Sequence, residues 1–278
     1  MSDALAWAGT AVGSPVVAHE SLTGGMTSTM LALTHADGRR TVLREIDREP
    51  WRAHAAALTA REAVTQRLLE GTDLPAPRSL ALDAPSGRHL MTLLPGRVRD
   101  DAPDEVVDGL ARLLARVHAV RPPAGAWPRD YQSWAWEAKL VVPAWARDAE
   151  AWETAFALLR TAPPPHEPTF LHRDLSPRNV LWRDDEVTGL VDWVETSTGP
   201  AWLDVAHCAT NLALRHGTER ADALGKAYTR LTGRAPQPHV DVMDVVGMLP
   251  PPGRPAMITD AAERDRLELR LVAVLEKI

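Results

Sequence analysis

The spacing of apolar residues is mostly strand-like before Pro95 and Gly96 and mostly helical after them. Before that point, short runs typical of strands alternate with turn residues, and after it apolar residues recur at helical intervals. A pattern of one period does not satisfy the other kind of element. We therefore expect an α+β fold with two lobes, a strand-rich lobe at residues 1–95 and a larger helical lobe at residues 96–278.

The first lobe is predicted to be a small antiparallel sheet with one helix. Turn residues separate the first three of its five expected strands, and Leu74-Pro75-Ala76-Pro77 precedes the last two. A helical pattern stands between these groups and ends before Gly71. The expected strands are residues 16–19, 30–34, 40–46, 78–83 and 88–94, and the expected helix is residues 53–69.

The second lobe is predicted to be mostly helical. One apolar stripe runs along residues 106–117, after Pro103, Asp104 and Glu105, which form a suitable first turn. Five further helices are expected at residues 147–160, 201–216, 219–231, 239–247 and 261–276.

Composition excludes several classes of partner. The formal charge is −6 and no Lys or Arg cluster stands out, so we expect no nucleic-acid partner. No run approaches the roughly 20 apolar residues of a membrane-spanning helix, and residues 1–10 do not resemble a secretion signal. The single Cys208 fits a cytoplasmic protein. No sequence feature indicates a protein partner, and any metal is expected to have oxygen ligands.

The segment from Phe170 to Trp193 carries the strongest chemical signal. It contains Asp174, Asn179 five positions later, and Asp192 after a short apolar stretch. Phosphoryl transfer needs a carboxylate that accepts the proton of the attacking hydroxyl, and hard oxygen ligands that hold Mg²⁺ against the phosphates. Asp174 suits the first role, and Asn179 and Asp192 suit the second. A buried polar turn is the structural alternative.

This segment resembles the aminoglycoside phosphotransferase and choline kinase-like family, which shares the protein-kinase fold. The order His172-Arg173-Asp174 departs from the usual small-molecule members, which carry Gly at position 173. Asp204-Val205-Ala206 resembles the downstream Asp-Leu-Ala of the family, 12 residues after Asp192. That distance leaves no room for a long activation segment, so protein substrates are not expected. Asp204 itself is expected to support the loop or cap a helix.

The resemblance implies a nucleotide site in the first lobe, with ATP or GTP as the phosphate donor. Glycines and hydroxyls between two expected strands are expected to face phosphate oxygens. Arg44 matches the phosphate-binding cation and Glu62 its helix partner, while Leu93 lies in the segment that matches the linker holding adenine. The turn residues are Gly24, Gly25, Thr27 and Ser28. The alternatives are an ordinary turn, a surface arginine, a solvated glutamate and a core strand.

The acceptor is left open by the sequence. The resemblance implies a small molecule with a hydroxyl, either an aminoglycoside or other antibiotic, with antibiotic resistance as the outcome, or a metabolite such as an amino alcohol, a sugar or a homoserine-like compound. Tryptophans and acidic residues in the middle of the chain are candidates for the acceptor pocket, although helix packing is the favoured explanation for each tryptophan and a solvated surface position for each carboxylate. These residues are Trp127, Trp134, Trp136, Trp145, Trp152, Trp182, Trp193, Asp130, Glu137, Asp148, Glu150 and Glu195.

Two rival classes of protein would carry different sequence signals. A nucleotide-binding pseudokinase would be expected to lack Asp174 or Asp192, and both are present. A nucleophile-elbow hydrolase would need a GxSxG turn, which the sequence does not contain. His207 and Cys208 lie in an expected helix and receive no chemistry from any recognised motif.

Overall fold

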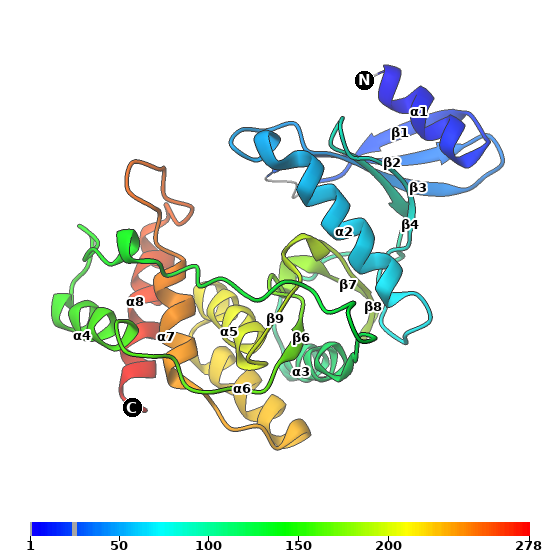
Figure 1. Cartoon of the computed structure of the whole chain (residues 1–278). Coiled ribbons are helices and arrows are strands. Elements are labelled where there is room, and N and C mark those ends of the chain that lie inside the picture. The colour runs from blue at the N-terminus through cyan, green and yellow to red at the C-terminus, as the bar shows by residue number, and fades with distance from the viewer. Residues whose placement is uncertain (1, 24–26) are drawn as a thin grey trace. The chain divides into compact units, whose positions relative to one another are not determined.

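The computed structural model describes residues 2–23 and 27–278 and divides the chain into two compact units (Figure 1). The sheet unit comprises Met1–Val98 and Arg178–Thr196, and the helical unit comprises Arg99–Pro177 and Ser197–Ile278. No sequence signal discussed above predicts that Arg178–Thr196 returns to the first unit.

The sheet unit is built on five antiparallel strands in the order β1-β2-β3-β5-β4. Each strand begins and ends within two residues of its expected segment, because turn residues such as Asp37-Gly38 end each run. Their bounds are β1 Val16–Ser21, β2 Thr29–His35, β3 Arg40–Glu45, β4 Ser79–Asp83 and β5 Arg88–Thr92. The expected small antiparallel sheet is confirmed.

One helix covers each face of this sheet. Successive side chains of a strand point to opposite faces. Leu43 of β3 belongs to an apolar cluster with Ala4 and Ala8 of α1 (Ser2–Val12), whereas the next residue, Arg44, bonds α2 (Ala55–Leu69). A short 3₁₀ turn, η1 (Trp51–His54), leads into α2. Helix α1 was not expected, because its buried face is made of alanine and glycine and gives little apolar contrast.

A hairpin from later in the chain completes the sheet unit. It consists of β7 (Val180–Arg183) and β8 (Glu186–Leu190) and is followed by the 3₁₀ turn η4 (Trp193–Glu195). The backbones of Trp182 in this hairpin and of Arg97 exchange two hydrogen bonds. The Leu190 N–H donates to the Pro75 carbonyl at 2.8 Å. Gly96 sits at φ +103°, where a Cβ would lie 2.7 Å from the Trp182 carbonyl oxygen. Only glycine fits this junction.

The helical unit holds two groups of packed helices. One group surrounds the buried Trp152 and includes α4, α7 and α8, and the other packs α6 between α3 and α5, with α5 also packed on α7 and α8 (Figure 1). The strands β6 (Thr169–Leu171) and β9 (Ser197–Gly199) form a short antiparallel pair. Two 3₁₀ turns, η2 (Glu137–Lys139) and η3 (Pro177–Asn179), complete the elements, and η3 spans the division between units. The helices are α3 Asp104–Ala119, α4 Ala149–Leu159, α5 Trp202–His216, α6 Thr218–Thr232, α7 Pro238–Gly247 and α8 Ala261–Leu275. Within the described residues, no helix combines the length and apolar character that crossing a membrane requires.

Candidate active site

The loop that carries Asp174 is tied to the start of α5 by Asp204. The carboxylate of Asp204 accepts hydrogen bonds from the backbone N–H of His172 at 2.9 Å and of Arg173 at 2.7 Å, and it contacts Nε2 of His118 at 3.2 Å. Burial by itself would raise the pKa of Asp204, but the hydrogen bond and charge of His118, with His172, hold it below its ordinary value. Asp204 is therefore an ionised carboxylate that holds the loop backbone in place through these hydrogen bonds.

Arg173 adopts a conformation that is unusual for a residue with a side chain. Its φ is +77°, in the left-handed region, and the residue is buried. The guanidinium carbon lies 4.0 Å from the centre of the Trp134 ring, and one of its N–H groups donates to the Gln132 carbonyl at 3.1 Å. These contacts offset a backbone cost of about 1–2 kcal/mol, which explains how arginine is accepted in this left-handed conformation.

Asp174 is held by the loop on one side and by α5 on the other. Its backbone N–H donates to Nδ1 of His172 at 3.2 Å, and its Oδ1 lies 3.0 Å from Nε2 of His207. The side chain of Asp174 is 30% exposed, whereas that of His207 is 5% exposed. A solvent-reachable carboxylate is thus oriented by a buried ring, which is the arrangement that a general base needs.

His207 links Asp174 to a second carboxylate, that of Asp244 on α7. Nδ1 of His207 lies 3.1 Å from Oδ1 of Asp244. Burial alone would lower the pKa of His207, but the charge of Asp244 and the hydrogen bonds to Asp174 and Asp244 raise it to about 9. No motif in the sequence marks His207. One signal was present, since His207 stands one helical turn after Asp204 and so faces the same loop.

In the sheet unit, Arg44 joins two of the other predicted residues. Its Nη1 lies 3.0 Å from Oε1 of Glu62 and 2.9 Å from Oδ1 of Asp192. Arg44 and Glu62 are buried, while the side chain of Asp192 is 34% exposed. The expected pairing of Arg44 with Glu62 is therefore present, and it extends to the carboxylate predicted for the metal.

Glu62 has a second partner that sequence reasoning missed. Its Oε2 lies 3.0 Å from Nδ1 of His89, whose Nε2 lies 3.0 Å from the Ser79 hydroxyl oxygen. Burial would raise the pKa of Glu62, but the charge of Arg44, followed by the contacts with His89, holds it below its ordinary value. No motif marks His89, because it reaches Glu62 only through the pairing of β5 with β3.

The two residues predicted to bind Mg²⁺ lie next to each other in the sheet unit. The N–H of Val191 donates to the carbonyl of Asn179 at 2.9 Å, and Asp192 follows in the left-handed region at φ +67°. Amide and carboxylate oxygens are suitable ligands for this ion. Across the described residues, no three or more His, Cys, Asp or Glu side chains gather as a metal site. Two protein ligands fit Mg²⁺, which usually keeps several waters and substrate phosphates.

The other residues predicted to bind the nucleotide lie in the segment before β2 and directly after β5. Gly24 and Gly25 lie outside the described residues. Ser28 is buried, Thr27 is half-buried, and the neighbouring Thr29 donates to Asp47 through its N–H and its hydroxyl. Leu93 is the first residue after β5 and is half-buried.

The candidate acceptor residues divide into packing residues and exposed ones. Trp152 and Trp193 are fully buried, Trp182 is nearly so, and Asp148 caps α4 by accepting from the Ala151 N–H. Glu137 pairs with Arg160 on the surface. Trp134 is the informative tryptophan, because its ring contacts both Arg173 and the edge of His207, at 5.3 Å between ring centres.

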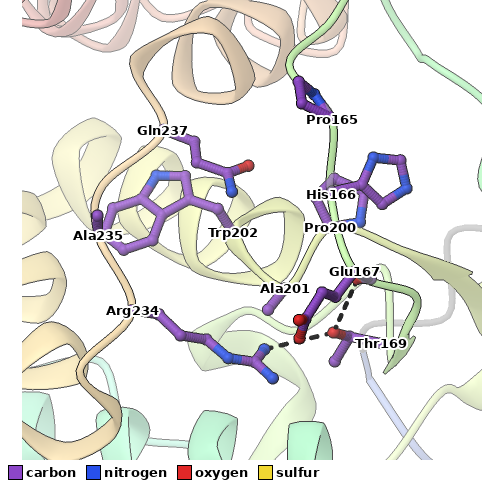
Figure 2. A pocket seen from close by; sticks show the side chains of 10 residues that line it. All are labelled: Pro165, His166, Glu167, Thr169, Pro200, Ala201, Trp202, Arg234, Ala235 and Gln237. Carbon is purple, nitrogen blue, oxygen red and sulfur yellow. Dashed lines mark hydrogen bonds between the residues drawn. The ribbon is translucent and has the colours of Figure 1, made fainter.

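A pocket of about 250 Å³ opens elsewhere in the helical unit (Figure 2). It lies at the starts of β6 and α5 and at the segment between α6 and α7, and one N–H of Arg234 donates to the Thr169 hydroxyl at 3.4 Å. Neither Asp174 nor His207 is among its lining residues, which are Pro165, His166, Glu167, Thr169, Pro200, Ala201, Trp202, Arg234, Ala235 and Gln237.

Known phosphotransferases share this fold. Macrolide 2′-phosphotransferase MphH from Brachybacterium faecium is 20% identical, with a TM-score of 0.65 and 98% of both chains covered. Aminoglycoside phosphotransferase APH(4)-Ia, in a complex with ADP and hygromycin B, is 15% identical with a TM-score of 0.67, covering 98% of this chain and 97% of that one. APH(2″)-IIa with streptomycin and ATP is 14% identical, with a TM-score of 0.63, covering 88% and 87%.

The sequence comparisons are consistent with the fold. No curated protein matches the chain. The phosphotransferase enzyme family matches residues 19–239, which include the strands around Arg44, the loop of Asp174 and the helix of His207. Since that match spans most of the chain, the protein belongs to the phosphotransferase enzyme family and has its α+β, kinase-like fold.

Proposed function

We propose that this protein transfers the γ-phosphoryl group of ATP or GTP to a hydroxyl of an aminoglycoside-like antibiotic or related small molecule, in the cytoplasm and with Mg²⁺. The observation that carries the proposal is the presentation of Asp174. Its carboxylate is 30% exposed, while the groups that orient it, His207 and the Asp204-braced loop, are buried. A general base needs this combination of access and fixed orientation.

In the proposed reaction, the acceptor hydroxyl loses its proton to the carboxylate of Asp174. The hydroxyl oxygen forms a bond to the γ-phosphorus, and the bond from that phosphorus to the bridging oxygen breaks, which releases the nucleoside diphosphate. Asp174 then returns the proton to solvent. Its side chain is exposed enough for that return.

The sheet unit supplies the groups for the nucleotide. Arg44 carries a fixed positive charge for phosphate oxygens, and Glu62 holds it in place. Asp192 and Asn179 would hold Mg²⁺, and the hydrogen bond from the Val191 N–H to the Asn179 carbonyl keeps these two parts of the chain together. When bound, this ion supplies charge that offsets the phosphate oxygens.

The acceptor class rests on similarity and on the architecture around Asp174. The structures similar to this chain include enzymes named for macrolides and others bound to hygromycin B, streptomycin or gentamicin. Trp134 contacts Arg173 and His207, so it lies beside the loop of Asp174. An aromatic ring there suits the apolar face of a sugar.

The test is mass spectrometry of reactions that contain Mg²⁺, ATP or GTP, and pooled aminoglycosides, macrolides and hydroxylated metabolites. We expect one small molecule to gain a phosphate. Asp174→Asn should retain nucleotide binding and lose about 10²- to 10⁴-fold in turnover, because the side chain keeps its shape but no longer accepts a proton.

The matched control is Asp184→Asn in the turn between β7 and β8. Asp184 is exposed at φ +54°, a conformation that asparagine also adopts, so this variant should keep its activity. Near-normal turnover by Asp174→Asn would remove Asp174 from the mechanism. Nucleotide binding with no phosphorylated product from the whole pool would favour a pseudokinase, and a phosphorylated metabolite would replace the antibiotic as acceptor.

A further inference from the structure

The carboxylate proposed as the base is one end of a buried chain of three side chains. Nε2 of His207 lies 3.0 Å from Oδ1 of Asp174, and Nδ1 lies 3.1 Å from Oδ1 of Asp244. These residues come from the catalytic loop, α5 and α7. We propose that His207 is a positioning residue for Asp174, held as a cation by Asp244 on the far side of its ring. This inference rests on the proposed function for its catalytic meaning.

The protonation of His207 follows from the hydrogen-bonding capacity of its partners. An ionised carboxylate only accepts hydrogen bonds, whereas a neutral imidazole has one donor nitrogen and one acceptor nitrogen. Only the doubly protonated ring donates to Asp174 and Asp244 together. The raised pKa of His207, about 9, agrees with this geometry. A cation between two carboxylates also limits the cost of burying them.

The other charged and polar groups around the ring do not replace either carboxylate. The Asn211 side-chain amide, on the next turn of α5, lies 3.3 Å from Nε2 of His207, and Trp134 packs its ring edge-on. Lys139 lies near enough to Asp244 for their charges to interact, and its ammonium donates to the Gly247 carbonyl. Asp204 and Arg173 are engaged with the loop itself, with His118 and with Trp134.

A protonated ring cannot take the proton of the acceptor hydroxyl, so His207 does not act as the base. Its contribution is to fix the direction of the Asp174 carboxylate and to favour the ionised form of that group. Loss of the ring charge should therefore lower kcat and move the acid limb of the pH–rate profile to higher pH. It should leave the KM for nucleotide unchanged, because Arg44 and Asp192 belong to the sheet unit.

The kinetic test uses His207→Gln and Asp244→Asn, with Asp241→Asn as the matched control. Asp241 and Asp244 are both buried on α7, but Asp241 bonds Arg270 and Trp202 instead of His207. We expect His207→Gln to lose about 10- to 100-fold in kcat, which is the usual effect of removing a group that orients a site residue. The acid limb of its pH–rate profile should move to higher pH. Asp244→Asn should show the same changes to a smaller degree. Asp241→Asn should change the melting temperature without either kinetic effect.

A measurement that does not depend on turnover separates this inference from the proposed function. In ¹⁵N-histidine NMR spectra of the wild-type protein, the His207 ring, identified by its loss in His207→Gln, should carry a proton on both nitrogens at pH 7. A neutral His207 in an active enzyme would overturn the inference and leave the proposed function standing. Kinetic changes in Asp241→Asn equal to those in Asp244→Asn would also overturn it. Absence of any product from the wild type, with His207 protonated, would instead overturn the proposed function, and the positioning role with it.

Discussion

At the scale of single residues, one arginine of the sheet unit is shared between two carboxylates. Nη1 of Arg44 serves a buried glutamate and a partly exposed aspartate at once. Lysine would offer a point charge without the planar fork, so the two residues are not interchangeable here. Asp192 is the member of this group that solvent, and therefore a bound ion, can reach.

Substitution of Asp192 by asparagine tests that reading. Asp192→Asn should weaken Mg²⁺-dependent nucleotide binding by about 10- to 100-fold, because the ion loses a charged oxygen ligand. Calorimetric titration of nucleotide with and without Mg²⁺ measures the effect. Equal Mg²⁺ dependence in the variant and the wild type would assign the ion to other ligands.

Glu62 should matter more for stability than for metal binding. Glu62→Gln removes a fully buried charge that Arg44 and His89 both contact, so we expect a loss of about 3 kcal/mol in the free energy of unfolding. Urea denaturation measures it. The control Glu186→Gln alters an exposed residue of β8 and should stay within about 0.5 kcal/mol of the wild type. Similar losses in the two variants would show that the buried pair contributes little.

At the scale of elements, α5 is the helix that organises the loop of Asp174. Asp204 and His207 are three residues apart and so lie on one face, where the first binds the loop backbone and the second binds the Asp174 side chain. A single helix thereby sets both the path of the loop and the direction of its carboxylate. Cys208 is on the same helix and is fully buried, and burial raises the pKa of its thiol, which keeps it unreactive.

The raised pKa of His207 predicts how stability changes with pH. A group whose folded pKa exceeds its unfolded value contributes stability that is complete below the unfolded pKa and disappears as pH rises through the folded one. For His207 the window is 6.5 to about 9. The difference in unfolding free energy between the wild type and His207→Gln should therefore shrink as pH increases across that window. Denaturation curves at pH 6 and pH 9.5 measure it, and a constant difference would contradict a cationic His207.

The elements that the sequence predicted well are those with a strong period. The apolar stripe of residues 106–117 became the buried side of α3, and the strands next to Asp37-Gly38 pair as a hairpin. Helix α1 was not predicted, because its buried residues Ala4 and Ala8 are hardly more apolar than the rest of the helix. The three-residue strands β6 and β9 are too short to show a period, and they pair across a long stretch of chain.

The candidate site divides in the same way. The spacing of Asp174, Asn179 and Asp192 is local and was readable because phosphoryl transfer needs those groups in that order. His89 and Asp244 could not be predicted as partners, and the place of His207 one helical turn after Asp204 indicated only that it faces the loop. Each of them meets its site residue only through pairing or packing of segments far apart in sequence, and an isolated buried histidine has no chemical signature of its own.

At the scale of the whole molecule, little chain separates the proposed metal ligand from the helix that braces the base. Residues 193–203 are taken up by η4, β9 and the start of α5. A protein kinase docks its peptide on a longer segment at this point, and this chain has none between Asp192 and Asp204.

Peptides should therefore fail as substrates where small molecules succeed. A peptide library incubated with Mg²⁺ and ATP or GTP should yield no phosphopeptide by mass spectrometry. Phosphopeptides in the absence of any phosphorylated small molecule would contradict the assignment of the acceptor.

If the acceptor is an amino sugar, added salt should raise its apparent KM more than it changes kcat, because exposed carboxylates then attract its ammonium groups.

The interleaving of the two units has a consequence during synthesis on the ribosome. The sheet unit takes its strands from Met1–Val98 but its hairpin and Asp192 from Arg178–Thr196. At translation rates of about 5–20 residues per second, the intervening residues 99–177 take roughly 4 to 16 s to make. Throughout that interval the nascent sheet lacks the segment that packs on α2 and bonds Pro75. We expect this face to stay open to chaperones until residues 178–196 are made, and a chain released before residue 196 should keep it uncovered.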